Sequence, residues 1–265
     1  MKINRPEMIL FDYGGTLLCE PDWDLLRGEK AVFRHVVHNP LHCRPEDLAA
    51  WETEYIQQII GIRDFGAEMT EIQHLRLKYE LHGIKLDISY EEAELVLWDH
   101  ASPMTERCVY PHIREVLKTL NERGIRTGVI SNLVWSGSAL KRRIDTLLPE
   151  NRFEFVITSS DYGLRKPDTR LFRVALHKAG MDPKRVWFCG NSYKKDIEGA
   201  WSAGISGVLY QGHMDGDRKE LNEPTSCSEH TVIIKDWLEL LHALDETPEK
   251  GDGLADMALK RQRES

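Results

Sequence analysis

The sequence has no run of apolar residues that approaches the roughly 20 needed to span a bilayer, and it has no excess of positive charge. It carries 35 lysines and arginines against 43 aspartates and glutamates in 265 residues, a formal net charge of −8. This balance does not favour a general attraction to nucleic acid or to anionic lipid. We therefore expect neither nucleic acid nor a membrane as a partner.

Paired cysteines are also missing. The five cysteines are odd in number and show no CxxC spacing, which fits a reducing compartment better than a disulfide framework. No apolar stretch follows the first basic residues, so no signal peptide is expected. The eleven histidines show no zinc-ligand spacing. These absences predict a cytoplasmic protein without a zinc site.

Helical spacing dominates the chain after residue 18. Apolar residues recur at helical intervals, with charged faces, over residues 23–37, 45–62, 70–82 and 90–100. Breakers separate these segments, and no strong strand signal interrupts them. The pattern predicts an all-helical domain over residues 19–106, inserted early into a larger domain.

Strands and helices alternate in the rest of the chain. Short apolar runs predict strands over residues 7–11, 125–130, 155–157, 186–189, 207–210 and 231–234. Helical spacing predicts helices over residues 112–123, 137–147, 169–179, 195–203 and 236–244. Such alternation is typical of a parallel sheet covered on both faces. We predict a Rossmann-like α/β core from residues 1–18 and 107–245, followed by a charged, flexible tail over residues 246–265.

Polar residues cluster where the predicted strands end. The clusters lie at residues 12–16, 131–132, 165–168 and 190–196. In an open parallel sheet, ligands bind beyond the carboxyl ends of the strands. The topology thereby gathers a carboxylate, a hydroxyl, an ammonium and a second carboxylate at one edge, from Asp12, Ser131, Lys166 and Asp196. This set suits transfer of a phosphoryl group.

Each component has a physical role in such a reaction. Asp12 can attack phosphorus and form an aspartyl-phosphate, which splits one displacement into two. Lys166 supplies positive charge to a phosphoryl oxygen and to the nucleophile. Mg²⁺ would neutralise the repulsion between that carboxylate and an anionic substrate. Hydrogen bonds to phosphate oxygens can come from side-chain and backbone donors at Ser131, Asn132, Gly14 and Gly15.

The order and content of these clusters resemble the motifs of the haloacid dehalogenase (HAD) superfamily of hydrolases. Residues 12–16, Asp-Tyr-Gly-Gly-Thr, are similar to its first motif, Asp-x-Asp-Gly-Thr, with Gly14 in place of the second aspartate. Ser131 resembles the second motif, residues 166–168 (Lys-Pro-Asp) the third, and residues 190–200 the fourth. The resemblance implies a capped, phosphatase-like hydrolase, with residues 19–106 as a helical cap inserted after the first motif.

The resemblance also implies a magnesium site. Its ligands would be the nucleophile Asp12, the backbone carbonyl of residue 14 and the acid of the fourth motif. Gly14 retains that carbonyl, but Asn191 supplies a neutral amide oxygen where the family usually has an aspartate. Asp196 can compensate, directly or through water. Mg²⁺ is therefore the expected cofactor, bound with reduced attraction.

Gly14 leaves the source of the proton open. In phosphatases of this superfamily the second aspartate protonates the leaving alcohol, and such acid–base help is worth roughly 10²–10⁴-fold. Our first hypothesis is a Mg²⁺-dependent phosphatase acting on a small phosphorylated metabolite, with atypical or reduced acid–base catalysis. Such an enzyme would favour a good leaving group or take a proton donor from the cap entrance, where the candidates are Glu20, Asp22, His35 and His38.

Two alternatives stay open. Phosphonate-cleaving members of the superfamily carry a small residue at the position of Gly14 and use a cap lysine as a Schiff base. The cap lysines here are Lys30, Lys78 and Lys85. The other alternative is a non-catalytic protein that binds a phosphorylated ligand or a partner, because two acids of the site are replaced. Tyr13 is either a packing residue or a wall of the substrate site.

Overall fold

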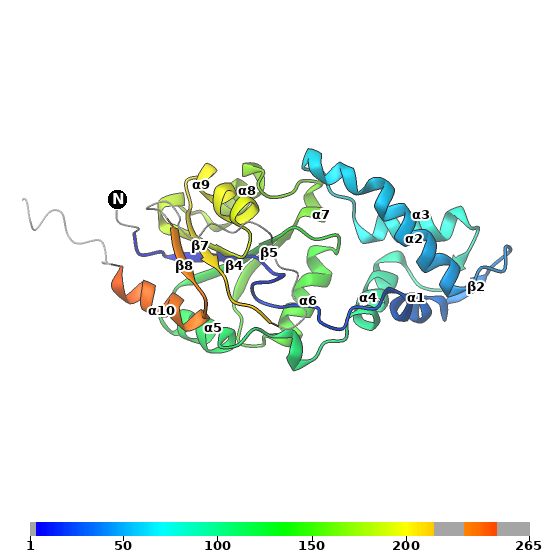
Figure 1. The fold of residues 1–265 in the computed structure, drawn as a ribbon, viewed down its shortest axis with the longest axis horizontal. Helices are drawn as coiled ribbons and strands as arrows, with labels where there is room; N and C mark the ends of the chain where they lie inside the picture. Colours follow the sequence, from blue (N-terminus) through cyan, green and yellow to red (C-terminus); the bar gives the residue numbers. More distant parts are fainter. Residues whose placement is uncertain (1–3, 215–230, 248–265) are drawn as a thin grey trace, which may run out of the picture.

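Six parallel strands form the central sheet of the computed structural model, which describes residues 4–214 and 231–247 (Figure 1). The predicted parallel sheet is confirmed, because each strand lies within two residues of its expected bounds. In spatial order the strands are β5 (Phe153–Thr158), β4 (Arg126–Ser131), β1 (Met8–Phe11), β6 (Val186–Gly190), β7 (Ser206–Tyr210) and β8 (Thr231–Ile234).

The central strand β1 places the first polar cluster at the sheet edge. All four of its residues are fully buried. Its last residue, Phe11, lies beside Val129 of β4 and Cys189 of β6. Because these strands are parallel and in register, Asp12 after β1 and Ser131 at the end of β4 reach the same edge.

Alternate residues of β1 pack against opposite helical layers. Ile9 and Phe11 belong to one apolar cluster, and Met8 and Leu10 belong to another. Figure 1 shows α8 and α9 on one side of the sheet and α5 and α10 on the other. Among the helices that flank the sheet, those that contribute buried side chains to the first cluster are α5 (Ile113–Glu122), α6 (Gly137–Leu147) and α10 (Trp237–Glu246). Those of the second are α8 (Thr169–Ala179) and α9 (Gly199–Ser202).

The prediction of a regular α-helix over residues 195–203 is wrong. The chain forms a wide π turn, η4 (Tyr193–Glu198), followed by the short α9. The Asp196 carboxylate accepts a hydrogen bond from the backbone N–H of Ser192 at 2.9 Å. Such local side-chain bonds compete with a regular helix. The wide turn therefore brings Asp196 back toward the end of β6.

Four α-helices and a 3₁₀ helix form a second part of the molecule, which we call the helical unit. They are α1 (Leu25–Phe33), α2 (Pro45–Ile59), η1 (Ile60–Phe65), α3 (Glu71–Leu81) and α4 (Tyr90–Ala101). The helical unit lies at one end of the long axis of the molecule (Figure 1). α1 and α4 approach closely because α1 carries Gly28, where a Cβ would collide with the Leu97 carbonyl oxygen. The remaining short helices are η2 (Glu106–Cys108), α7 (Ser159–Tyr162) and η3 (Pro183–Arg185).

The expectation that this part is all-helical is wrong. β2 (Val36–His38) and β3 (Lys85–Leu86) form a two-stranded antiparallel sheet. The register pairs Val36 with Leu86 and His38 with Lys85. Strands of three and two residues are too short to show an alternating pattern, so tertiary contact rather than periodicity determines this pair.

The helical unit and the sheet share a continuous core. Buried Trp98 of α4 and Ile113 of α5 belong to the same apolar cluster. The chain crosses between the two parts side by side, where the backbone N–H of Cys19 donates to the Cys108 carbonyl at 2.8 Å. The division into a cap over residues 19–106 and a core over residues 1–18 and 107–245 stays a prediction.

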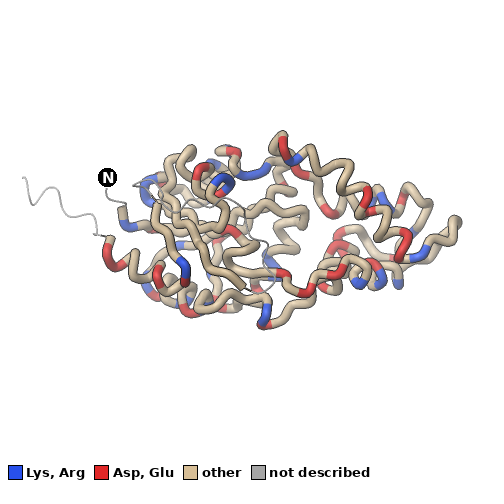
Figure 2. The backbone as a smooth tube through the Cα atoms, viewed as in Figure 1, with Lys and Arg blue, Asp and Glu red and all other residues tan. Residues whose placement is uncertain are grey.

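Charged residues of both signs occur at interspersed positions along the backbone of both parts of the molecule (Figure 2). Within the described ranges, no helix combines the length and the apolar character that a membrane crossing requires. α10 continues to Glu246, two residues beyond its expected end. From residue 248 onward, the predicted flexible tail lies outside the described residues.

Candidate active site

Asp12 is fixed at the end of β1 by its own backbone. Its N–H donates to the Cys189 carbonyl of β6 at 2.8 Å, which continues the pairing of the two strands by one residue. Its side chain is 13% exposed and lines a cavity, and its Oδ1 lies 2.8 Å from the Lys166 Nζ. A carboxylate held by a buried strand and open to a cavity can act as a nucleophile.

Lys166 joins the two aspartates of the predicted site. Its Nζ lies 2.8 Å from Asp12 Oδ1 and 2.7 Å from Asp196 Oδ1, and it donates to the Ile130 carbonyl at 2.9 Å. Burial alone would lower the pKa of Lys166, but the two carboxylates outweigh burial and raise that pKa. The lysine therefore keeps its charge beneath the cavity.

Asp196 is completely enclosed. One oxygen contacts Lys166, and the other accepts the Ser192 N–H described above. Burial raises the pKa of Asp196 to about 6, Lys166 opposes that rise and Asp12 adds to it. A Cβ at residue 190 would overlap the Asp196 carboxylate, so Gly190 leaves the space that this side chain occupies.

Asn132 positions the lysine. Its Oδ1 accepts the backbone N–H of Lys166 at 2.7 Å, and its Nδ2 donates to the Lys166 carbonyl at 2.9 Å. Its side-chain amide is thus engaged with the chain itself, and its predicted contact with phosphate stays a prediction. Ser131 is buried and lines the cavity beside Asn132. The peptide bond between Lys166 and Pro167 is cis.

The two glycines of the first cluster differ in their surroundings. A Cβ at Gly14 would meet no heavy atom within 4 Å, so the place of the missing acid is open space. Gly15 has φ +71°, and a Cβ there would overlap the Asn191 side-chain amide. Gly15 therefore permits the close approach of Asn191 to the nucleophile loop.

The predicted magnesium ligands lie around one cavity. Asp12, Gly14, Asn191 and Asp196 all line it. They provide two carboxylates, an amide oxygen and a backbone carbonyl, which are hard oxygen donors of the kind that Mg²⁺ prefers. Among residues 4–214 and 231–247, no group of three or more His, Cys, Asp and Glu side chains could hold a metal. The set therefore fits Mg²⁺ with one charge fewer than a three-carboxylate site.

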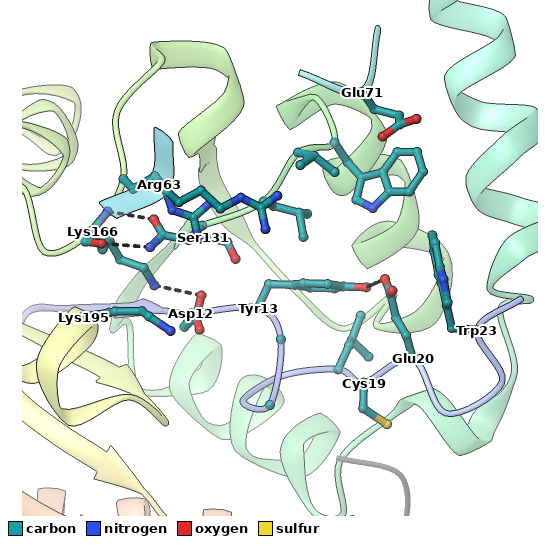
Figure 3. A pocket seen from close by; sticks show the side chains of 18 of the residues that line it. Asp12, Tyr13, Cys19, Glu20, Trp23, Arg63, Glu71, Ser131, Lys166 and Lys195 are labelled. Carbon is teal, nitrogen blue, oxygen red and sulfur yellow. Dashed lines mark hydrogen bonds and ion pairs between the residues drawn. The ribbon is translucent and has the colours of Figure 1, made fainter. Parts of the chain in front are cut away.

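The cavity has a volume of about 540 Å³ and lies between the sheet edge and the helical unit (Figure 3). This is large enough for a small metabolite. Side chains that the sequence analysis did not assign to the site also line it. They include Glu52, Arg63, Glu71, His74, Trp135, Arg165 and Lys195.

The two arginines enter the site through a contact between the helical unit and the core. Glu68, between η1 and α3, pairs with Arg165 and, at 3.3 Å, with Arg63. Burial lowers the pKa of Arg165 to about 10, with the Arg63 charge adding and Asp12 opposing. Arg165 directly precedes Lys166 in a predicted cluster, whereas Arg63 gave no signal because packing of the inserted helices brings it to the cavity.

α3 carried a pattern that could have revealed its part in the site. Glu71, His74 and Lys78 recur at the i, i+3 and i+7 spacing of one helix face, together with Leu75 and Tyr79. All five are buried. Ionisable residues at the positions of an apolar stripe indicate a buried polar cluster, and this one reaches the cavity through Glu71 and His74.

Of the four candidate proton donors, only Glu20 lines the cavity. Glu20 lines the cavity, where it accepts hydrogen bonds from the Trp98 Nε1 at 2.9 Å and from the Tyr13 hydroxyl at 3.2 Å. Asp22 pairs with Arg107, His35 pairs with Asp87, and His38 is exposed. None of these last three lines the cavity.

Tyr13 combines packing with a place in the cavity wall. Its ring is buried and its hydroxyl oxygen accepts from Arg143 Nε at 3.0 Å. Trp98, which it contacts edge-on, stacks on Trp135 with ring centroids 4.6 Å apart. Its packing role is therefore confirmed, and because it lines the cavity as well, its role as a wall of the substrate site stays a prediction.

No candidate lysine for a Schiff base reaches the cavity. Lys30 forms an exposed pair with Glu46, and Lys85 lies exposed on β3. Lys78 is fully buried between Glu29 and Glu52. None of the three lines the cavity, so the geometry gives the Schiff-base alternative no amine in position.

The structure has a parallel α/β sheet that holds a lysine between two aspartates at its edge, beside a cavity that helices also line, and this edge is where open α/β folds bind ligands. Comparison with known families narrows the class of protein. The family model of haloacid dehalogenase-like hydrolases matches residues 42–209, which is more than half of the chain. The chain belongs to this family, as the resemblance of its motifs predicted.

Individual relatives cover parts of the chain. It is 35% identical over 137 residues to a glyceraldehyde 3-phosphate phosphatase of Methanothermobacter thermautotrophicus, spanning 51% of this chain and 58% of the relative. It is 32% identical over 162 residues to haloacid dehalogenase-like hydrolase domain-containing protein 3 of Mus musculus, spanning 58% of each. The chain thus spans little more than half the length of these curated relatives.

One solved structure shows the shared fold over most of the chain. A HAD phosphatase from Thermococcus onnurineus superposes with a TM-score of 0.57 and 24% sequence identity, covering 89% of this chain and 97% of that one. This likeness extends beyond the matched family region at both ends. The fold of the helical unit and the sheet therefore agrees with that of the family.

Proposed function

We propose that this protein is a phosphatase that hydrolyses small phosphate monoesters through an aspartyl-phosphate at Asp12. The observation that carries the proposal is the contact of one buried Lys166 Nζ with both Asp12 and Asp196 at the edge of the cavity. The relative from Methanothermobacter thermautotrophicus is named as a phosphatase, which supports the same class of reaction.

The reaction proceeds in two displacements. An Asp12 carboxylate oxygen attacks phosphorus, and the bond from phosphorus to the alcohol oxygen breaks, leaving the electron pair on that oxygen, which takes up a proton. Water then attacks the phosphorus of the aspartyl-phosphate. This step releases phosphate and a proton and regenerates the Asp12 carboxylate.

The residues around Asp12 stabilise the negative charge of the transferring group. Lys166 orients Asp12 and offers its charge to a phosphoryl oxygen, and Ser131 offers a hydroxyl at the same edge. Arg63 and Arg165 line the cavity and add positive charge. Asp12, the Gly14 carbonyl and Asn191 would hold Mg²⁺, with Asp196 behind them. When bound, that ion would offset the repulsion between the nucleophile and the phosphate oxygens.

Proton transfer is the weak part of this site. Gly14 offers no side chain, and Glu20, the acid candidate that lines the cavity, already accepts hydrogen bonds from Tyr13 and Trp98. An alcohol of low acidity then leaves slowly, because acid catalysis normally contributes roughly 10²–10⁴-fold. We therefore expect aryl phosphates to be hydrolysed faster than alkyl phosphates.

The proposal is tested with an aryl phosphate and Mg²⁺, using the full chain beside Asp12→Asn. The variant should lose activity by roughly 10³-fold or more, because the nucleophile is removed. Asp245→Asn serves as the matched control, since Asp245 is exposed, pairs with Arg123 and does not line the cavity. Equal rates for the wild type and Asp12→Asn would reject the aspartyl-phosphate.

A second candidate is a protein that binds a phosphorylated ligand without turning it over. The observation in its favour is the replacement of two acids by Gly14 and Asn191 within one cavity. It predicts saturable binding of inorganic phosphate by the wild type with no turnover of any ester. Turnover that disappears in Asp12→Asn would exclude it.

A further inference from the structure

The two ends of the cavity carry different charged groups. At the sheet edge, Lys166 contacts Asp12 and Asp196. Arg63 and Arg165 also line the cavity, and both pair with Glu68. At the helical unit, Glu52 of α2 together with Glu71 and His74 of α3 forms the wall. Figure 3 places Glu71 on the far side of the cavity from Lys166, with Arg63 between them. A phosphate group fits the first end, and its chemistry does not fit the second.

The carboxylates at the second end belong to a buried cluster with one lysine. Lys78 Nζ lies 2.5 Å from Glu29 Oε2 and also pairs with Glu52. The Tyr79 hydroxyl donates to the other oxygen of Glu29. The side chains of Lys78 and Glu29 have no exposed area and that of Glu52 has 3%. Lys78 therefore forms ion pairs with two buried carboxylates at the same time.

Glu71 and His74 complete the cluster and leave polar atoms without partners. His74 Nδ1 lies 3.5 Å from Glu71 Oε2, and the two side chains are 3% and 4% exposed. Glu71 Oε1 and His74 Nε2 have no hydrogen-bond partner among the residues that the structure describes. Burial and the Glu52 charge raise the pKa of Glu71. Two buried polar atoms beside a cavity are costly unless a ligand or water satisfies them.

The charges of the cluster do not balance. Glu29, Glu52 and Glu71 face one lysine, and even a protonated His74 would leave three carboxylates against two cations. Burial of an unmatched carboxylate is expensive, and a further positive group would reduce that cost. A compact ammonium suits the place, because it carries three donors and the cluster offers acceptors on Glu52 and Glu71.

We infer that the second end, formed by Glu52, Glu71 and His74, is a subsite for an ammonium group, and that the substrates are phosphate monoesters of amino alcohols. This inference rests on the proposed function, which places the phosphate at Asp12. The ammonium takes no part in the displacement; it binds the helical unit while the phosphate reaches the nucleophile. A carboxylate in the same place would meet like charges.

Three esters of matched length test the inference on the wild type. They are 2-aminoethyl phosphate, 2-hydroxyethyl phosphate and 2-phosphoglycolate, which differ in the charge of the terminal group. We expect kcat/KM to be about tenfold higher for the amine than for the hydroxyl, and lowest for the carboxylate. Equal values for the amine and the hydroxyl, or a preference for 2-phosphoglycolate, would overturn the inference.

A substitution then assigns the preference to the cluster. Glu71→Gln keeps the shape of the side chain and removes its charge, so the ratio of kcat/KM for the amine over the hydroxyl should fall about tenfold. Glu80→Gln is the matched control, because Glu80 is exposed on the same helix and does not line the cavity. A ratio that is unchanged in Glu71→Gln, or that falls equally in Glu80→Gln, would contradict the role of Glu71.

A binding measurement separates this inference from the proposed function. Asp12→Asn should bind 2-aminoethyl phosphate about tenfold more tightly than 2-hydroxyethyl phosphate in calorimetry, without any turnover. If the wild type hydrolyses aryl phosphate but Asp12→Asn shows no preference, the ammonium subsite fails and the phosphatase stands. If no ester is hydrolysed but the preference in binding remains, the phosphatase fails and the subsite stands.

Discussion

Two buried lysines, each between two carboxylates, lie in different parts of this molecule. Lys166 contacts Asp12 and Asp196 at the edge of the sheet, and Lys78 contacts Glu29 and Glu52 among the helices. In both cases the carboxylates raise the pKa of the lysine although burial acts in the opposite direction. Composition and charge alone do not distinguish the two groups.

The two lysine clusters differ in how far their carboxylates are exposed to the cavity. Asp12 follows directly after β1 and keeps 13% of its side chain exposed beside the cavity, whereas Lys78 and Glu29 are enclosed on all sides. The strand end gives Asp12 an open side, whereas the packed helices leave Glu29 with no exposed area and Glu52 with 3% of its side chain exposed. The first arrangement suits a reaction, and the second holds α1, α2 and α3 together.

The largest effect should come from removing the enclosed lysine. Lys78→Met leaves Glu29 and Glu52 buried without a cation, and we expect the free energy of unfolding to fall by about 3–5 kcal/mol. Urea denaturation measures it. Lys30→Met, which breaks the exposed pair with Glu46, should cost less than about 1 kcal/mol. An equal decrease in the free energy of unfolding in the two variants would show that the enclosed ion pairs stabilise the protein no more than the exposed pair does.

Lys166→Met should instead act on the reaction. Without its charge the transferring phosphoryl group loses one stabilising contact, so kcat for an aryl phosphate should fall by roughly 10²–10³-fold. Steady-state kinetics measure this. Lys194→Met is the control, because Lys194 is exposed on the same edge and does not line the cavity. A variant that retains full activity would mean that Lys166 is only structural, like Lys78.

Gly14→Asp would sharpen the comparison by adding the acid that the open site lacks. The new side chain has space, since a Cβ at Gly14 meets no heavy atom within 4 Å. We expect kcat for an alkyl phosphate to rise about 10²-fold, within the range of general acid catalysis. Gly14→Asn has the same shape but no acidic proton, so its rate should stay near that of the wild type. An equal gain in both variants would exclude acid catalysis as the cause.

The smallest effect concerns pH. Asp196 has its pKa raised from 3.8 to about 6, so below pH 6 a proton binds a carboxylate that would attract Mg²⁺ in the proposed site. The apparent affinity for Mg²⁺ should therefore fall by up to about tenfold per pH unit below 6 and level off above pH 7. Calorimetric titration at pH 5 and pH 7.5 measures it. Asp196→Asn should bind Mg²⁺ more weakly and lose this dependence on pH.

The residues around Lys166 could be predicted from sequence because each lies at, or within six residues after, the end of a buried strand. Asp12 follows β1, Ser131 ends β4, and Asp196 comes six residues after β6 ends at Gly190. Parallel pairing alone then brings them to one edge. The π turn that orients Asp196 was not predictable from periodicity, since it depends on a hydrogen bond between that side chain and the Ser192 backbone.

The other end of the cavity could not be predicted in the same way. Glu52 and Glu71 lie on different helices, and only the packing of α2 against α3 brings them to one wall. Helical periodicity predicts that charged residues face solvent, yet Glu71 is 3% exposed. Charged residues at the apolar positions of α3 were the available signal for a buried polar cluster. This signal describes a single helix, so it does not predict that Glu52 of α2 lies at the same wall.

The first residue of α3 is hydrogen-bonded to the core, and this contact bears on the length of ligand that the cavity can accept. The backbone N–H of Glu71 donates to the Val134 carbonyl at 2.9 Å, three residues after Ser131. This hydrogen bond ties the first residue of α3 to the loop that follows β4. Because this main-chain contact holds the start of α3 against the core, we expect the proposed site to select substrates by their length as well as by their charge.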